Sequence, residues 1–216
     1  MVRTIVLKDL ELQILLVASG VKGILGFKQA EVKEEGRIPY LIHEMVRKGV
    51  VEQREGELAV KEPYRSIIDG IKNAKAVLLA RNGESKRNIE YLYLGARIIK
   101  MSDSINDKDA VKLQCLTDEE VTEWLNVHFV AEKPVICPKE FIKDVFWEGG
   151  SCKEVVELYL VRDLKEAIPT CTWGLYEGKY QTYIKITDKD VVIYKAYEEW
   201  SNAEIVEVVN KKTGGI

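Results

Sequence analysis

Histidine and cysteine, the side chains that most often bind metals, are scarce in this sequence. It contains two histidines, His43 and His128, and four cysteines, none of them in a Cys-x-x-Cys or His-x-x-x-His arrangement. Zinc sites and thiol–disulfide redox motifs depend on such close spacing. The sequence therefore predicts no metal site and no cofactor, and it gives neither histidine a catalytic role.

The four cysteines could form two disulfides by number, but their scattered spacing in a cytoplasmic protein favours four reduced thiols. Cys115 and Cys171 fall within apolar, strand-like segments, and neither has a basic neighbour placed to activate its thiol. We expect both residues to lie in strands and to be at least partly buried. Neither is expected to be a fast nucleophile.

Long hydrophobic runs and signal sequences are also lacking. The longest runs, such as Ile14–Ala18, have about five residues, whereas a membrane-spanning helix needs about 20. The start of the chain has neither a long apolar stretch nor a small-residue cleavage site. The 5 prolines and 15 glycines are too few for collagen-like or proline-rich disordered chains. We expect a cytoplasmic protein that does not insert into membranes.

No charge of one sign dominates. The sequence has 32 Lys and Arg against 35 Asp and Glu, a net charge of −3. It is therefore neither a basic nucleic-acid coat nor an acidic tail. Hydrophobic residues make up 46% and charged residues 31% of the 216 residues, which is ordinary for a globular protein with a sizeable core. We expect a single compact unit over 1–216.

The first 75 residues have a pattern of helices. Apolar spacing predicts a helix over 9–20, with Asp9 as its N-cap. Pro39 fits the first turn of a second helix, which ends near Lys48. A further helix is expected over 63–73. The residues expected on or near the buried side of the second helix are Tyr40, Leu41, Met45 and Val46.

A hairpin is predicted directly after the second of these helices. Residues 50–54 and 57–61 alternate in polarity on either side of the turn Glu55-Gly56. A helix followed by a hairpin is the order of the last helix and the wing of a winged helix. We therefore describe residues 1–75 as an N-terminal winged-helix-like segment.

From residue 76 onward the sequence predicts one order of elements twice. Four strands and a helix fill a first sheet-plus-helix half, 76–130, and the same order returns in a second half, 131–216. The expected strands are 76–81, 89–94, 97–101 and 110–116, then 155–162, 170–176, 180–186 and 191–197, and the helices are 118–129 and 201–209. The expected fold is α+β, with a mainly antiparallel sheet in two pseudo-duplicated halves, although such a succession can also arise without duplication.

Two local signals support this division. Thr117 and Glu120 have the spacing of a capping box at the start of the helix over 118–129. Between the halves, a helix is predicted over 138–147. It is followed by the glycine pair at 149–150, which we expect to be a hinge or boundary.

The winged-helix-like segment offers a weak case for DNA binding. Its second helix carries His43, Arg47 and Lys48, but also Glu44, and the hairpin 52–57 is net acidic. Residues 1–75 contain 13 basic and 11 acidic residues, so no concentrated basic surface is predicted. Nucleic acid is thus an unlikely partner, and the same shape is better suited to packing or protein binding.

Motifs of common enzymes are missing as well. Gly-x-Ser-x-Gly and the phosphate-binding Gly-x-x-x-x-Gly-Lys-Ser/Thr do not occur. Tyrosines are more informative. Alternation along the strand 180–186 puts Tyr183 on its polar side, and Tyr176 lies in a similar position beside Gly174. Because exposed aromatic side chains often anchor protein partners, we predict that Tyr176 and Tyr183 bind a protein.

The pattern as a whole resembles the EspG family of type VII secretion chaperones. The residues that carry the resemblance are Leu10–Leu16, the strand pair 89–94 and 97–101, the junction Leu116–Glu120, and its counterpart near Glu199–Glu204. The resemblance covers most of the chain and rests on architecture. It implies a protein without catalytic residues, whose sheet clasps a helical-hairpin export substrate and keeps it soluble.

The residues by themselves leave two alternatives open. One is a winged-helix transcriptional regulator with a C-terminal ligand-sensing part, and the other is an enzyme with an unrecognised site.

Overall fold

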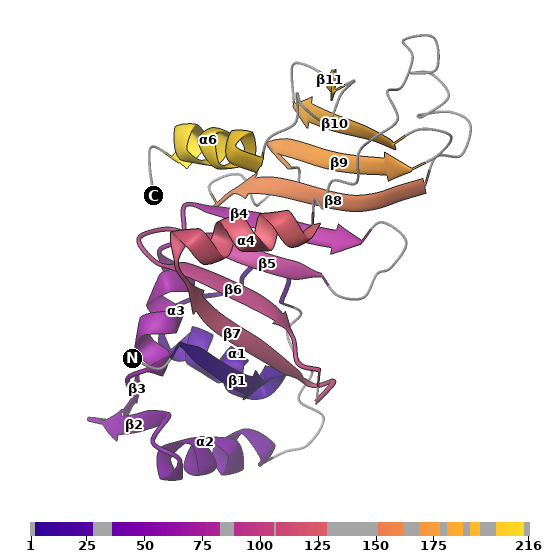
Figure 1. The fold of residues 1–216 in the computed structure, drawn as a ribbon. Helices are drawn as coiled ribbons and strands as arrows, with labels where there is room; N and C mark the ends of the chain where they lie inside the picture. Colours follow the sequence, from indigo (N-terminus) through magenta and orange to yellow (C-terminus); the bar gives the residue numbers. More distant parts are fainter. Residues whose placement is uncertain are drawn as a thin grey trace. The chain divides into compact units, whose positions relative to one another are not determined.

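In the computed structural model the protein has an α+β fold with mainly antiparallel strands (Figure 1). The structure describes residues 3–27, 36–82, 89–105, 107–128, 151–161, 169–177, 181–187, 191–194 and 202–213. Within these ranges the side chains of 82, 127–128, 151–155, 174–177, 181–187, 191–194, 202–204 and 212–213 are not described. The predicted helix over 138–147 and the glycines at 149–150 lie outside the described residues.

Residue contacts group the chain into two compact units. Unit 1 comprises Met1–Ala74 and Tyr93–Leu116, and unit 2 comprises Lys75–Leu92 and Thr117–Ile216. The expected first half, 76–130, is thus divided between the two units. Strand β5 (Glu90–Leu94) contributes residues to both.

In unit 1, strand β7 (Ala110–Leu116) lies between β1 (Thr4–Lys8) and β6 (Ile98–Asp103), and both pairs are antiparallel. Strand β1 alternates strictly between exposed and buried residues, with Ile5 and Leu7 in the core. The sequence analysis did not predict β1. Its pairing partner is more than 100 residues away, and the consecutive apolar residues Ile5, Val6 and Leu7 show no alternation of polar and apolar side chains.

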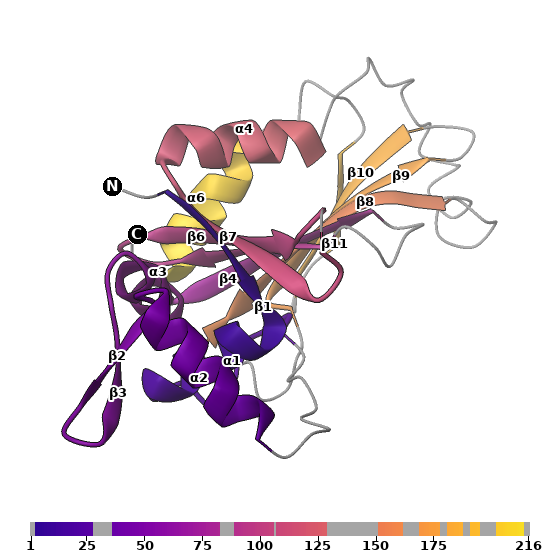
Figure 2. The same cartoon turned by 90° about the horizontal axis from the view of Figure 1, so that it is seen from below.

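The helices of unit 1 are α1 (Asp9–Ala18), α2 (Arg37–Arg47) and α3 (Tyr64–Lys72). They gather on one side of the strands β1, β6 and β7 (Figure 2). Helix α3 approaches β6 closely at Gly70, where an added Cβ would lie 2.7 Å from Cγ1 of Ile99. This close approach explains a glycine within the last turn of a helix, where it otherwise weakens the element.

The predicted hairpin is confirmed as β2 (Val51–Arg54) and β3 (Glu57–Val60), with Arg54 opposite Glu57. Glu55 and Gly56 both have positive φ, at 51° and 86°, as a two-residue hairpin turn of the mirror-image type requires. The order of helix and hairpin is therefore as expected. The winged-helix assignment itself stays a prediction.

In unit 2 the strands are arranged in the order β4-β8-β9-β10-β11, and the pairs with a described register are antiparallel. Helices α4 and α6 pack against each other. The bounds are β4 (Ala76–Asn82), β8 (Ser151–Leu160), β9 (Cys171–Glu177), β10 (Gln181–Thr187), β11 (Val191–Tyr194), α4 (Asp118–His128) and α6 (Asn202–Thr213).

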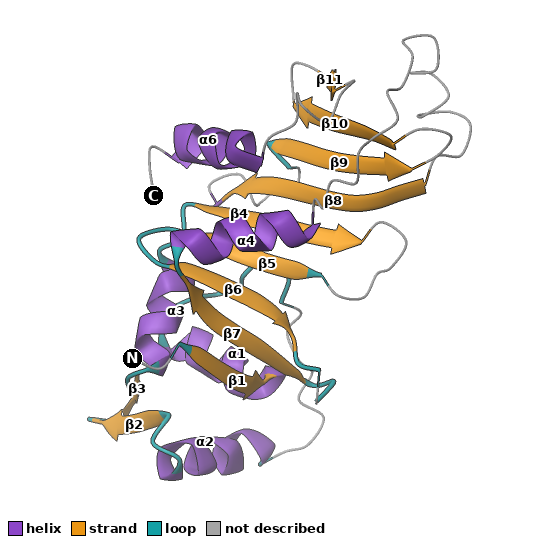
Figure 3. Ribbon diagram, viewed as in Figure 1, coloured by secondary structure: helices purple, strands orange, loops and turns teal. Residues whose placement is uncertain are grey.

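The predicted repetition of elements is present in the order along the chain. Strands β4 to β7 precede α4, and strands β8 to β11 precede α6 (Figure 3). The capping box at the start of α4 also forms: the Thr117 backbone N–H donates to Glu120 Oε2 at 2.7 Å, and the Glu120 N–H donates to Thr117 Oγ1 at 3.3 Å.

The expected location and burial of two of the cysteines are confirmed. Cys115 lies in β7 and is partly buried, and Cys171 lies in β9 and is fully buried. Both are free thiols. The expected N-cap of α1 is wrong: the N-cap is Lys8, and Asp9 is the first residue of the helix.

Candidate functional site

Helix α2 covers little of the core. Met45 is its only buried residue, although the helix carries apolar side chains along most of its length. Ile38 and Val46 are 38% and 41% exposed, and Ile42 between them is half-buried. Their spacing of i, i+4 and i+8 places the three side chains in one row on the helix surface. We name Ile38, Ile42 and Val46 the α2 ridge.

The sequence analysis placed part of this helix on the wrong side. Of the four residues expected on or near the buried side, Met45 is buried and Leu41 half-buried, but Tyr40 is 68% exposed and Val46 is also exposed. Apolar spacing identifies a helix face without showing what covers it. One signal in the sequence could have revealed the exposed row. The apolar stripe of α2 is broader than the face that a single contact with the core would bury.

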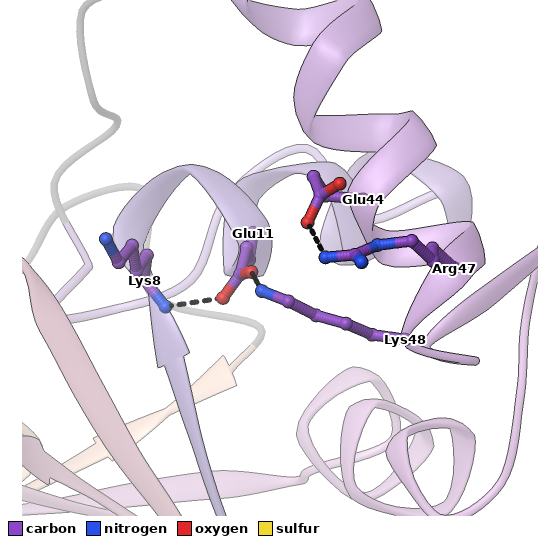
Figure 4. A network of polar contacts seen from close by, with 5 residues as sticks. All are labelled: Lys8, Glu11, Glu44, Arg47 and Lys48. Carbon is purple, nitrogen blue, oxygen red and sulfur yellow. Dashed lines mark hydrogen bonds and ion pairs between the residues drawn. The ribbon is translucent and has the colours of Figure 1, made fainter.

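Two of the cations on α2 or just after it are paired within the protein (Figure 4). Arg47 Nη2 lies 2.7 Å from Glu44 Oε2, and this contact lowers the pKa of the Glu44 carboxyl and raises that of the guanidinium. Lys48 Nζ lies 3.4 Å from Glu11 Oε1. Each of these two cations therefore has a carboxylate neighbour within the protein.

Glu11 joins three elements of unit 1. Its side chain is buried, and its Oε2 accepts the Lys8 backbone N–H at 3.0 Å while its Oε1 faces Lys48 (Figure 4). The end of β1, the first turn of α1 and the end of α2 thus meet at one carboxylate. A buried carboxylate needs such partners, because an unpaired one is strongly destabilising.

The hairpin after α2 is also self-paired. Arg54 Nη2 lies 2.5 Å from Glu52 Oε1, and the turn between the strands contains Glu55 and Gly56. Of the residues that sequence analysis proposed for DNA contact, Arg47 and Lys48 are engaged with carboxylates and His43 is exposed on α2.

An open pocket of about 340 Å³ lies between the first turn of α1, the first half of α2 and the turn before β7. Its lining includes Asp9, Asp107 and Asp109 together with Arg37 and Tyr40. Burial, and then the neighbouring aspartates, raise the pKa of the Asp9 carboxyl. Among the described residues, no three His, Cys, Asp or Glu side chains are arranged to hold a metal ion.

Unit 2 contains a polar cluster that sequence analysis missed. Glu157 on β8 accepts a hydrogen bond from the Tyr159 hydroxyl at 2.8 Å and faces Arg81 Nη2 of β4 at 3.3 Å. Burial and the adjacent carboxylate raise the pKa of the Tyr159 phenol well above its usual range. Because Glu157 of β8 contacts Arg81 of β4, the cluster links two neighbouring strands.

The predicted binding residues Tyr176 and Tyr183 lie in β9 and β10. Thr182 is opposite Tyr176, and Leu175 is opposite Tyr183. Opposed residues of antiparallel strands share a face and successive residues alternate, so positions 176 and 183 belong to opposite faces. Position 183 shares its face with the buried Trp173. The side chains of both tyrosines are outside the described part of the chain, so their role stays a prediction.

No protein-family model matches the chain, and no curated protein matches it. In the portion of the chain that the structure describes, none of the helices has both the length and the apolar character to span a membrane.

Proposed function

We propose that the protein is a non-catalytic cytoplasmic adaptor or chaperone, which binds a helical protein destined for type VII secretion. The observation that carries this proposal is the α2 ridge, a row of apolar side chains left partly exposed on a helix with one buried residue. Exposed apolar side chains that adjoin one another are a feature of protein interaction sites.

The form of the ridge supports a helix as the partner. Residues spaced by four make one of the ridges that fit into the grooves of a second helix. Ile38 to Val46 spans two helical turns, or about 12 Å, which is enough for a short helix–helix crossing. A helical hairpin, the substrate type that the EspG resemblance implies, presents such grooves on its surface.

Co-expression tests this proposal directly. The protein is produced with each helical-hairpin protein encoded beside its gene, and co-elution at a fixed ratio is the expected result. Val46→Glu places a charge in the desolvated contact and should weaken binding by on the order of 2 kcal/mol. Val17→Glu is the matched control, because Val17 is 66% exposed near the end of α1 and outside the ridge.

Two outcomes would remove the proposal. One is that no helical-hairpin protein from the locus co-elutes with the wild-type chain. The other is that Val46→Glu and Val17→Glu retain such a partner equally well while both variants stay folded.

Tyr176 and Tyr183 of unit 2 are proposed as partner-binding residues in their own right. Because the two positions lie on opposite faces of β9 and β10, a partner that covers one face contacts one of them. Tyr183→Glu and Tyr176→Glu are therefore compared singly, by thermal midpoint and by partner retention. Lost retention at an unchanged midpoint supports a contact, whereas a collapsed midpoint identifies a core position.

A winged-helix regulator is the second candidate, favoured by the order α2, β2, β3. Fluorescence anisotropy with duplex DNA separates it from the first. We expect weak binding that disappears with modest salt, because Arg47 and Lys48 already have carboxylate partners. Sequence-specific binding in the nanomolar range would establish the regulator and displace the chaperone.

A further inference from the structure

Strand β1 forms an edge of its sheet. It pairs with β7 on one side and stands at the end of the strand order. The Cys115 N–H donates to the Arg3 carbonyl at 2.8 Å, and the Asp9 N–H donates to the Asp109 carbonyl at 2.9 Å. In an antiparallel pair the bonded residues alternate, so the odd-numbered residues of β1 direct their backbone groups to β7.

The even-numbered residues direct theirs away from β7. At Lys8 this outward N–H is taken, because it donates to Glu11 Oε2 at 3.0 Å. At Thr4 and Val6, no described residue is a hydrogen-bond partner for the outward N–H and C=O groups. The N–H and C=O groups of Thr4 and Val6 are therefore available to a further strand. The row ends at Lys8, because the Lys8 N–H is bonded to Glu11.

The exposed side chains beside this edge are one valine with polar and basic neighbours. Val6 is 56% exposed, and Thr4 and Lys8 on either side of it are exposed too. Lys112 lies directly opposite Val6 on β7 and is also exposed. Val6 is thus flanked by Lys8 along β1 and by Lys112 across the pair. Lys8 also lines the pocket that contains Asp9, Asp107 and Asp109, so Lys112 is the lysine of this face that lies away from those carboxylates.

We propose that β1 accepts an extended segment of a partner protein as an additional strand, and that this segment carries acidic side chains at alternate positions. Main-chain hydrogen bonds to Thr4 and Val6 would hold the segment, and its carboxylates would face Lys8 and Lys112. This surface is separate from the α2 ridge, and the proposal does not depend on the proposed function.

Charge argues against a second copy of the chain as the occupant. Two copies of β1 paired antiparallel about Val6 would bring two Lys8 and two Lys112 side chains to one face. Lysines on an edge strand are a common protection against self-association, and pairing of two copies would gather four positive charges on one face. The carboxylates of an acidic strand would instead be attracted by these lysine side chains.

The test uses a synthetic peptide of seven alternating glutamates and valines, blocked at both ends. We expect it to bind the full-length protein, while a lysine–valine peptide of the same length binds at least tenfold more weakly. The same acidic peptide with every backbone nitrogen methylated should not bind, since it cannot donate to the edge.

Val6→Pro removes an outward N–H without removing a hydrogen bond to β7, and edge strands tolerate proline at such positions. Peptide binding should fall at least tenfold, while Val6→Thr, which keeps the N–H, should bind as the wild type does. Lys112→Glu should reverse the preference between the acidic and the lysine peptide. Because Lys112→Glu leaves the backbone intact, it decides the question even if Val6→Pro unfolds the protein.

Three results would overturn the proposal. The first is absence of acidic-peptide binding to the wild-type protein at millimolar concentration. The second is equal binding of the methylated peptide, which would show that charge alone is responsible. The third is a concentration-dependent dimer abolished by Val6→Pro, which would make a second copy the occupant of the edge.

Discussion

Helices α1 and α2 belong to the same unit and have nearly the same length, but they use their apolar residues differently. Helix α1 buries Leu10, Glu11, Leu12, Leu15 and Leu16, whereas α2 buries Met45 alone. The apolar residues of α1 fill the core against the strands. Those of α2 form a row that the rest of the described chain covers only in part. Helix α1 is therefore a structural helix, and α2 is a candidate binding helix.

The largest expected effect lies in α1. Leu15 is fully buried, and Leu15→Ala should lower the free energy of unfolding by about 2–5 kcal/mol, because it leaves a cavity in the core. Val46→Ala in the α2 ridge should stay within about 0.5 kcal/mol. Chemical denaturation measures both. Equal losses for the two variants would mean that α2 is as much a core helix as α1.

The next effect concerns Glu11, the carboxylate at which the two helices meet. Glu11→Ala leaves the Lys8 N–H without its acceptor and removes the partner of Lys48, which should lower stability by about 1–3 kcal/mol. Glu11→Gln keeps an acceptor oxygen and should lose less. Glu44→Ala removes an exposed pair and should leave the denaturation midpoint unchanged. A Glu44→Ala loss as large as that of Glu11→Ala would contradict the structural role given to Glu11.

The smallest effect is a pH dependence at the start of α1. The raised pKa of Asp9 means that the folded state holds this proton more tightly than the unfolded chain does. Its favourable contribution is present below the ordinary pKa of 3.8 and is lost as pH rises through the raised value. Asp9→Asn should therefore raise the unfolding midpoint at pH 7 and lose this advantage at pH 3. A lower midpoint for the variant at pH 7 would show that the Asp9 carboxylate is favourable.

The fold was predictable where the signal is local. The turn Glu55-Gly56, the capping box of Thr117 and Glu120, and the succession of strands were all identified from spacing and turn chemistry. Strand β1 was missed because its identity depends on pairing with β7, which is distant in sequence. Hydrogen bonding between distant segments leaves no local pattern in either of them.

The candidate site was less predictable than the fold. Apolar spacing identified α2 as a helix, but burial of Met45 and exposure of Val46 depend on which elements pack against it. The pairing of Lys48 with Glu11, 37 residues away, is a tertiary contact of the same kind. Alternation within one strand does not show how that strand is aligned with its neighbour. The alignment of β9 with β10 places Tyr176 and Tyr183 on opposite faces, which the sequence alone could not show.

Hydrogen–deuterium exchange on the free protein and on its complex with a co-eluting helical-hairpin protein tests the central claim most directly. The account predicts that binding slows exchange in α2, while α1 exchanges at the same slow rate in both states, because its backbone is already protected by the core. Unchanged exchange across α2 in a complex that is fully formed would contradict the assignment of the α2 ridge as the binding surface.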